Sequence, residues 1–291
     1  MKTAIVGCNG LLGNALMRLW QQQSDDDVVA LDYPDCDITT RLLTLDQFQE
    51  IAPDVIINTT GISQIDWLEK RPNTARTVHI QGTANLREAA KRTKSKLVHI
   101  SCCEVFGNAS LNKMEPFSED DLPEPESVFA KTKWDSERAA SEWENHLIIR
   151  TSTLFGKLGT NSTGNMVESI CHALRRKEPL NIISDVPSSP TWSDDLAKAV
   201  FFLVKNDKRG LFHIANREYA TPYEISQEIL KLTGLKRDFR PITAQEYGFA
   251  APRAVHTMLY STKYHQLEGC FPMPRWRDSL RDYLSTRAAV Q

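Results

Sequence analysis

A turn with three regularly spaced glycines near the N-terminus constrains the fold of this chain most strongly. The turn reads Gly7-Cys8-Asn9-Gly10-Leu11-Leu12-Gly13, between an apolar run at 3–6 and an apolar-periodic helix that continues to Leu19. The first glycine permits a tight turn, the second lets backbone N–H groups approach a pyrophosphate, and the third lets helix and strand pack closely. Because the turn lies directly between a strand and a helix, it predicts a dinucleotide-binding site.

Strands and helices alternate along the first half of the chain. Continuous Val/Ile runs such as Val55-Ile56-Ile57 are typical of strands buried on both faces. This alternation predicts an α/β fold, a Rossmann-type doubly wound parallel sheet, with any cofactor at the carboxyl ends of its strands. The later strands are expected at 28–32, 53–58, 96–101 and 147–150, and the helices at 45–51, 75–93 and 128–146.

Beyond Gly156 the alternation loosens, and Thr221-Pro222 gives a clear helix-start signal. We therefore expect an NAD(P)-binding Rossmann domain at 1–155, to which 184–210 returns. A smaller C-terminal α/β substrate domain is expected from 156–183 and 211–291. Beyond Gly156, helices are predicted at 165–176, 221–233 and 276–287, and strands at 180–183 and 210–215. A further helix, which ends at 205, lies in the segment that returns to the Rossmann domain.

Composition excludes several classes of function. The 291 residues are 41% hydrophobic and 25% charged with a formal net charge of −2, so no nucleic-acid or membrane-surface footprint is present. No apolar run approaches the ~20 residues of a membrane span, and Gly7 interrupts the N-terminal run before it could serve as a signal peptide. The six cysteines lack CxxC or metal-ligand spacing, which predicts free thiols, no metal site and a cytoplasmic location.

An acidic residue ends the second predicted strand. Asp32 follows the glycine turn by about 20 positions, where a carboxylate meets the adenosine ribose 2′-OH and disfavours a 2′-phosphate. This position favours NAD over NADP without excluding NADP. The alternative role is the capping of a turn at the end of the strand.

The order of its motifs identifies the chain further. It resembles the extended short-chain dehydrogenase/reductase superfamily, most closely the dTDP-4-dehydrorhamnose reductase family, nearly end to end. It is also similar to the regulatory β subunit of methionine adenosyltransferase, a cofactor-binding partner more than an enzyme. The segments that carry the resemblance are GCNGLLG at Gly7, LDYPDCDIT at Leu31, PDVIINTTG at Pro53, GTANLREAA at Gly82, HISCCEVFG at His99, FAKTK at Phe129, IIRTSTLFG at Ile148, SSPTWSDDLAKA at Ser188, RPITAQEY at Arg240 and PRWRDSLRDYL at Pro274.

The resemblance implies reduction of a 4-keto nucleotide sugar with NAD(P)H, and it implies positions that hold the cofactor. The glycine turn would bind the pyrophosphate, a strand-end acid the adenosine ribose, and Lys133 the nicotinamide ribose. The implied cofactor-binding residues are Gly7, Asn9, Gly10, Leu11, Leu12, Gly13, Asp32, Asp37 and Ile38 (the last two near the adenine), Thr59, Thr60, Gly61, Lys133 and Thr151, with Ser152 beside the nicotinamide.

The reacting end departs from the family pattern. The superfamily uses a tyrosine acid four residues before a lysine, and the lysine lowers the pKa of the phenol so that it can pass on its proton. Here that motif reads Phe129-Ala130-Lys131-Thr132-Lys133, and phenylalanine has no proton to give. The family's Ser/Thr position falls on Cys102, a weak hydrogen-bond donor, its asparagine on His79 and its tryptophan on Thr153.

Three functions remain open from the sequence. The first is a reductase with impaired proton transfer, and the second is a non-catalytic NAD(P)-binding subunit that regulates or scaffolds a partner enzyme. The third uses Glu104 with Cys102 or Cys103 for dehydratase- or epimerase-type chemistry, because related dehydratases carry a Thr-Asp-Glu triplet there. The catalytic candidates are therefore Lys133, Cys102 and Glu104. The small-molecule partner is a nucleotide sugar, and a homodimer is left open.

Several other residues have a simpler expected role. For Cys102 and Cys103, a role as buried packing residues is the alternative to a catalytic role. His79 and His99 are expected to be structural. Single arginines such as Arg150 and Arg253 are expected in surface salt bridges rather than at substrate phosphates.

Overall fold

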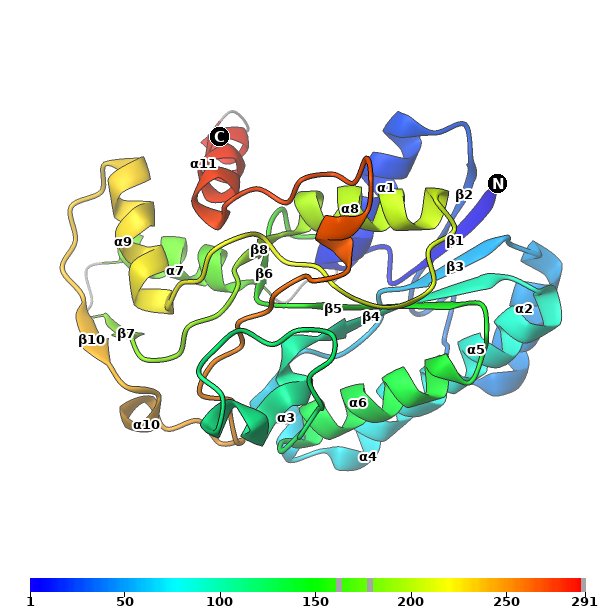
Figure 1. Ribbon diagram of the computed structural model, residues 1–291, viewed down its shortest axis with the longest axis horizontal. Helices are drawn as coiled ribbons and strands as arrows, with labels where there is room; N and C mark the ends of the chain where they lie inside the picture. The colour runs from blue at the N-terminus through cyan, green and yellow to red at the C-terminus, as the bar shows by residue number, and fades with distance from the viewer. Residues whose placement is uncertain (161–163, 177–179, 289–291) are drawn as a thin grey trace.

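The computed structural model describes residues 1–160, 164–176 and 180–288. Its centre is a six-stranded sheet in the order β2-β1-β3-β4-β5-β9, in which every neighbouring pair is parallel (Figure 1). The predicted Rossmann-type doubly wound sheet is therefore confirmed. The strands are β1 Lys2–Val6, β2 Asp27–Leu31, β3 Val55–Asn58, β4 Lys96–Cys102, β5 His146–Thr151 and β9 Gly210–His213.

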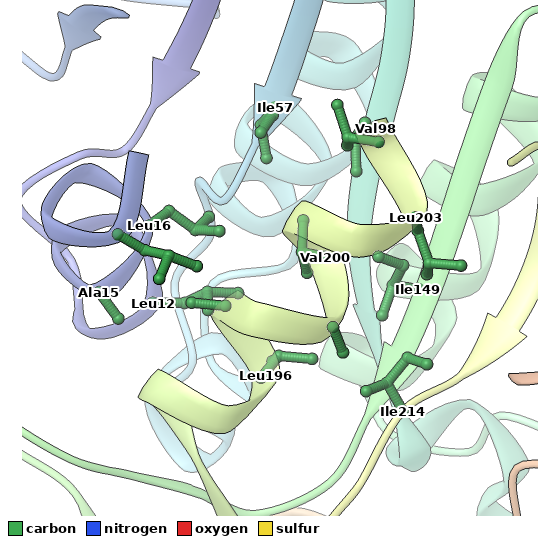
Figure 2. Close-up of a cluster of buried hydrophobic side chains, with 14 of the residues drawn as sticks. Leu12, Ala15, Leu16, Ile57, Val98, Ile149, Leu196, Val200, Leu203 and Ile214 are labelled. Carbon is green, nitrogen blue, oxygen red and sulfur yellow. The ribbon is translucent and has the colours of Figure 1, made fainter. Parts of the chain in front are cut away.

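Helices cover both faces of this sheet. On one face lie α1 (Leu11–Gln23) and α8 (Ser193–Lys205), and on the other lie α2 (Arg41–Ile51), α5 (Gly82–Thr93) and α6 (Val128–Ser141). Successive strand residues point to opposite faces, so one face of β3 contributes Ile57 to the first core and the other contributes Ile56 to the second. Figure 2 shows the first core, where leucines of α1 and α8 meet strand side chains.

The helix predicted at 75–93 contains a π-helical turn. It begins as α4 (Pro72–Ala75), passes through the π turn η1 (Arg76–Gln81) and continues as α5. A π turn adds a residue to the helix and often marks a functional site. Here it turns His79 inward, where its side chain is buried.

The C-terminal part packs around its own apolar core. Trp276 is fully buried there together with Phe155 and Ile225. A capping box between Thr221 and Glu224 starts α9, as its sequence signal predicts. The elements are β6 (Leu154–Phe155) paired with β8 (Thr191–Trp192), β7 (Asn181–Ile183) paired with β10 (Arg240–Ile242), α7 (Met166–Arg175), α9 (Pro222–Thr233), α10 (Ala244–Tyr247), η3 (Tyr264–Gln266) and α11 (Trp276–Ala288).

Two expected boundaries need correction. The helix predicted at 128–146 ends at Ser141, because Trp143 turns into the second core and donates its indole N–H to the Ser95 carbonyl at 2.8 Å. The main sheet also extends to His213 rather than 210, since β9 pairs with β5. The division of the chain into two domains otherwise stays a prediction.

The six cysteines are all unpaired. Within the described ranges no helix is long and apolar enough to cross a bilayer. The same residues contain no cluster of three or more His, Cys, Asp or Glu side chains that could hold a metal ion.

Candidate functional site

A cavity of about 740 Å³ lies at the carboxyl ends of the central strands. Its walls come from the glycine turn, the segment after β3, the end of β4, helix α6 and the segment from β5 to α7. This is the edge of a doubly wound sheet where ligands bind. Of the residues predicted for the site, its walls contain Gly10, Leu11, Leu12, Thr59, Thr60, Gly61, Cys102, Cys103, Glu104, Phe129, Lys133, Thr151 and Ser152.

The two outer glycines of the turn, Gly7 and Gly13, must be glycine for different geometric reasons. Gly7 has φ +84°, and a Cβ there would lie 2.8 Å from Thr59 Oγ1. A Cβ on Gly13 would lie 2.1 Å from the Gly7 carbonyl oxygen. The turn therefore brings the start of α1 to the cavity, where Leu11 and Leu12 lie in the first helical turn. Their N–H groups have no intrahelical partner and can bind an anion.

Side chains that directly follow β2 and β3 fix the turn. Asp32 accepts the Asn9 N–H at 2.7 Å and the Tyr33 N–H at 2.8 Å. Thr59 donates its hydroxyl to the Val6 carbonyl at 2.8 Å, so the end of β3 is tied to the end of β1. The glycine turn is thereby preorganised.

The residues predicted at the adenosine end lie outside the cavity walls. Asp37 accepts the Thr39 N–H at 2.9 Å, and the hydrogen bonds from Thr39 lower the pKa of the Asp37 carboxyl. Ile38 is a buried side chain, and Gly82 leaves the room that it occupies, because a Cβ on Gly82 would meet Ile38 Cδ1 at 2.6 Å. The adenosine roles of Asp32, Asp37 and Ile38 stay predictions.

The wall at the reacting end is apolar. Phe129 is only 8% exposed and packs in a cluster with Leu68 and Ala75, against which Cys102 also packs. The two family positions that hold a phenol and a hydroxyl therefore lie at one apolar cluster here. Neither carries a strong proton donor.

His79 contributes a neutral ring to the same wall. Its Nε2 accepts the Ile62 N–H at 3.2 Å, and its Nδ1 lies 2.8 Å from Thr132 Oγ1. The Thr132 hydroxyl donates to the Val128 carbonyl at 2.9 Å, so the ring proton belongs on Nδ1. Burial, with the Lys133 charge as the second cause, lowers the pKa of His79 to about 3. His79 therefore cannot supply a proton near neutral pH.

Lys133 lies one helical turn after Phe129 and is 6% exposed. Its ammonium donates to the Ile100 carbonyl at the end of β4, at 2.7 Å, and burial lowers its pKa. Beneath it, His99 lies between Asn58 Nδ2 at 3.2 Å and Ser136 Oγ at 3.0 Å. His99 thus occupies a core position between the sheet and α6.

The two adjacent thiols point into different surroundings. Cys102 packs against the Phe129 cluster, whereas Cys103 packs with Phe106 in another. Burial raises the pKa of Cys102 far above its usual range and that of Cys103 to about 12. Both are therefore neutral thiols near pH 7, and a neutral thiol is not the nucleophilic form.

Glu104 is the acidic side chain of the described cavity wall. It lies in the first turn of the 3₁₀ segment η2 (Cys103–Leu111). Burial raises the pKa of its carboxyl, while the charge of Arg253 opposes that shift. Glu104 is thus a candidate source of a proton inside the cavity.

The two arginines are both in ion pairs, but Arg150 is not on the surface. It is 2% exposed and makes a two-pronged pair with Glu137, with Nε–Oε1 at 3.0 Å and Nη2–Oε2 at 2.8 Å. The expectation of a surface salt bridge was wrong for Arg150, because Ser101 also donates to the Glu137 carboxylate within the core. Arg253 pairs with Asp66 at 3.0 Å.

Sequence reasoning missed a second close approach at the glycine turn. A Cβ on Gly159 would lie 2.0 Å from the Asn9 carbonyl oxygen and 2.8 Å from that of Gly10. Gly159, which follows β6, therefore packs directly against the turn. A glycine in a loop, without a strand and helix around it, gives no signal of such a contact.

The cavity fits a dinucleotide on two observations. The glycine turn is packed so closely that no Cβ fits at Gly7 or Gly13, and this packing brings N–H groups at the start of α1 to the cavity wall. The hydroxyl of Thr151 is buried in the wall and has no hydrogen-bond partner in the part of the chain that the structure describes. A buried polar group without a partner indicates a ligand atom or a water beside it.

A doubly wound parallel sheet, a glycine turn at its first strand end and a lysine on the helix beside the cavity define the extended short-chain dehydrogenase/reductase class. The chain belongs to the family described as the RmlD substrate binding domain, which matches residues 1–288. The resemblance inferred from its motifs is therefore confirmed.

Three relatives illustrate the match. The spore coat polysaccharide biosynthesis protein SpsK of Bacillus subtilis is 29% identical, over 99% of both chains. The structure of a dTDP-4-dehydrorhamnose reductase from Clostridium acetobutylicum is 27% identical, with a TM-score of 0.92 over 99% of this chain and 100% of that one. The reductase of Bacillus anthracis, solved in complex with NADP, is 26% identical, with a TM-score of 0.90 over 98% of this chain and 99% of that one.

Proposed function

We propose that this chain binds a nicotinamide dinucleotide and a 4-keto nucleotide sugar, and reduces the ketone slowly because the usual proton donor is absent. The observation that carries this proposal is Phe129, buried beside Cys102 one helical turn before Lys133. The family membership and the cavity at the strand ends support the binding part. A relative solved with NADP supports a nicotinamide cofactor, without deciding between NAD and NADP.

Each wall has a separate task in this proposal. The N–H groups at the start of α1 bind the pyrophosphate, and Lys133 and Thr151 hold the nicotinamide end. A dinucleotide held there would supply the hydride for the carbonyl carbon. The carbonyl oxygen then needs a proton, and Phe129 and neutral His79 cannot give one. A group of this kind contributes about 10²- to 10⁴-fold to a rate.

The substitution Phe129→Tyr tests the proposal. We expect it to raise kcat for dTDP-4-dehydrorhamnose reduction by about 10²-fold or more, because Lys133 lies one turn away to lower the pKa of the phenol. The measurement is NAD(P)H oxidation, with the double variant Phe129→Tyr, Lys133→Met as the control that must lose the gain. Turnover in neither protein, while the dinucleotide still binds by calorimetry, would overturn the reductase part.

That outcome would favour a second candidate, a non-catalytic dinucleotide-binding subunit of another enzyme. The observation behind it is the contrast between the preorganised glycine turn and the apolar reacting end. It requires a stable protein partner whose activity changes with the dinucleotide. Co-purification followed by an assay of the partner with and without NADH separates it from the first candidate.

A further inference from the structure

An exposed tryptophan lies in the wall of the cavity at its outer end. Trp67, on α3 (Ile65–Glu69), is 38% exposed, although it is the largest side chain of that helix. The next residue, Leu68, is fully buried and attaches α3 to the Phe129 cluster. The indole is therefore not needed to pack this helix.

A guanidinium covers this indole. Arg71 Cζ lies 4.3 Å from the centroid of the Trp67 ring, and Arg71 Nη1 is 3.4 Å from the Trp67 carbonyl oxygen. Within the described part of the chain no carboxylate pairs with Arg71, whereas nearby Arg253 is held by Asp66. A stacked guanidinium keeps its in-plane N–H donors available for an oxyanion.

Helix α3 is held in place on both sides of Trp67. Asp66 accepts the Ala251 N–H at 2.9 Å, and Glu69 accepts the Val128 N–H at 2.9 Å. The Arg71 N–H donates to the Leu68 carbonyl at 2.8 Å, so the turn that carries the guanidinium is ordered as well. The aromatic face and the cation thus form a preorganised pair.

The charged side chains of the described cavity wall leave the diphosphate of a nucleotide-sugar substrate without a cation. The charged side chains of its described wall are Lys133 and Glu104. Lys133 is buried and donates to the Ile100 carbonyl, and the N–H groups of α1 serve the pyrophosphate of the dinucleotide. A nucleotide sugar brings a second diphosphate, which needs a cation of its own. Arg71 is an exposed cation next to the wall.

We propose that Trp67 and Arg71 form the subsite for the nucleoside diphosphate part of the substrate. The base stacks on the face of the indole that the guanidinium leaves uncovered, and the diphosphate accepts hydrogen bonds from the guanidinium. The sugar then extends inward toward Phe129 and Lys133. The subsite rests on the proposed function, because it requires a nucleotide-sugar substrate.

Calorimetric titration of the full chain with dTDP, thymidine and NADH tests the subsite. Loss of a base–aromatic stack weakens binding by about tenfold or more, so Trp67→Ala should raise the Kd for both dTDP and thymidine by that factor. Trp67→Phe should retain most of the affinity. Arg71→Ala should raise the Kd for dTDP by about tenfold and leave that for thymidine unchanged, since thymidine has no phosphate.

The matched control is Arg76→Ala, which removes an exposed arginine five residues further on. It should leave the Kd for dTDP as in the wild type. NADH binding should be unchanged in every variant, which shows that each one is folded. Failure of the wild type to bind dTDP, or equal weakening in the Arg71 and Arg76 variants, overturns the subsite while NADH binding stands. Loss of NADH binding by the wild type would instead overturn the proposed function.

Discussion

At the scale of single residues, the site is decided by which side chains can still carry a proton. Phe129 has none, the His79 proton belongs on Nδ1 facing Thr132, and the thiols of Cys102 and Cys103 are too weakly acidic. Glu104 differs, because burial raises the pKa of a carboxyl on the cavity wall. Glu104 is therefore the candidate proton donor for any remaining reductase activity.

Glu104→Gln should lower the residual turnover of the wild type by about 10²-fold, since the amide cannot donate an acidic proton. The active form of an acid is the protonated one, so kcat of the wild type should fall as the pH rises through the raised pKa of Glu104. The variant should lose this dependence. A pH profile of kcat for NADH oxidation checks both, and Glu115→Gln, on the loop before α6, is the control. An unchanged rate in Glu104→Gln contradicts the assignment.

Asp32 decides a second single-residue question, the choice between NAD and NADP. Its carboxylate sits at the end of β2 and is fixed by the Asn9 N–H at 2.7 Å. We expect the wild type to bind NADH more tightly than NADPH, because the carboxylate repels a 2′-phosphate. Asp32→Asn, which retains an acceptor for the turn, should reduce that preference by about tenfold. Calorimetry with both dinucleotides measures it, and Asp35→Asn is the control. A wild-type preference for NADPH would contradict this role.

At the scale of elements, residues 157–160, which follow β6, lie against the glycine turn at Gly159. Gly159 approaches Asn9 and Gly10 so closely that a methyl group would overlap their carbonyl oxygens. Overpacking of this kind costs about 1–3 kcal/mol. The contact holds this short segment against the turn that is proposed to bind the pyrophosphate, so it should affect the binding of a dinucleotide.

Gly159→Ala should therefore weaken NADH binding by about tenfold, mainly through faster dissociation. The residue has no positive φ that would strain alanine, so the effect belongs to the contact with Asn9. Stopped-flow fluorescence of NADH release provides the measurement. Lys157→Ala, at an exposed position of the same segment, is the matched control. Equal release rates in both variants would refute the role of the contact.

Elements were predictable where one local pattern decides them. The Val/Ile run at β3 and the capping box at Thr221 both encode their own structure. The π turn at His79 was not predicted, because no local pattern indicates it and the partners of the ring, Ile62 and Thr132, lie in other segments of the chain. The same holds for the packing of Cys102 against the Phe129 cluster: the sequence shows both residues, but the fold brings them together.

At the scale of the whole molecule, three buried histidines should make the stability of the fold depend on pH. His79, His99 and His213 are each at most 2% exposed, and they lie in the π turn, in β4 and in β9. Burial lowers the pKa of each, to about 3 for His79. Residues from distant parts of the chain thus share one response to acid.

The stability of the fold should fall as the pH decreases below about 6.5, the pKa of an unfolded histidine. Above that pH both states are neutral at these rings. Below it the unfolded chain binds protons that the folded chain excludes, so each ring costs about 1.4 kcal/mol per pH unit until its folded pKa is reached. His79→Gln should therefore reduce the slope between pH 6 and 5 by about that amount. Urea unfolding at both pH values measures the slope, and His172→Gln, at an exposed position on α7, is the matched control. An unchanged slope in His79→Gln would mean that this ring is already charged in the fold, and would contradict the hydrogen bond that its Nε2 accepts from Ile62.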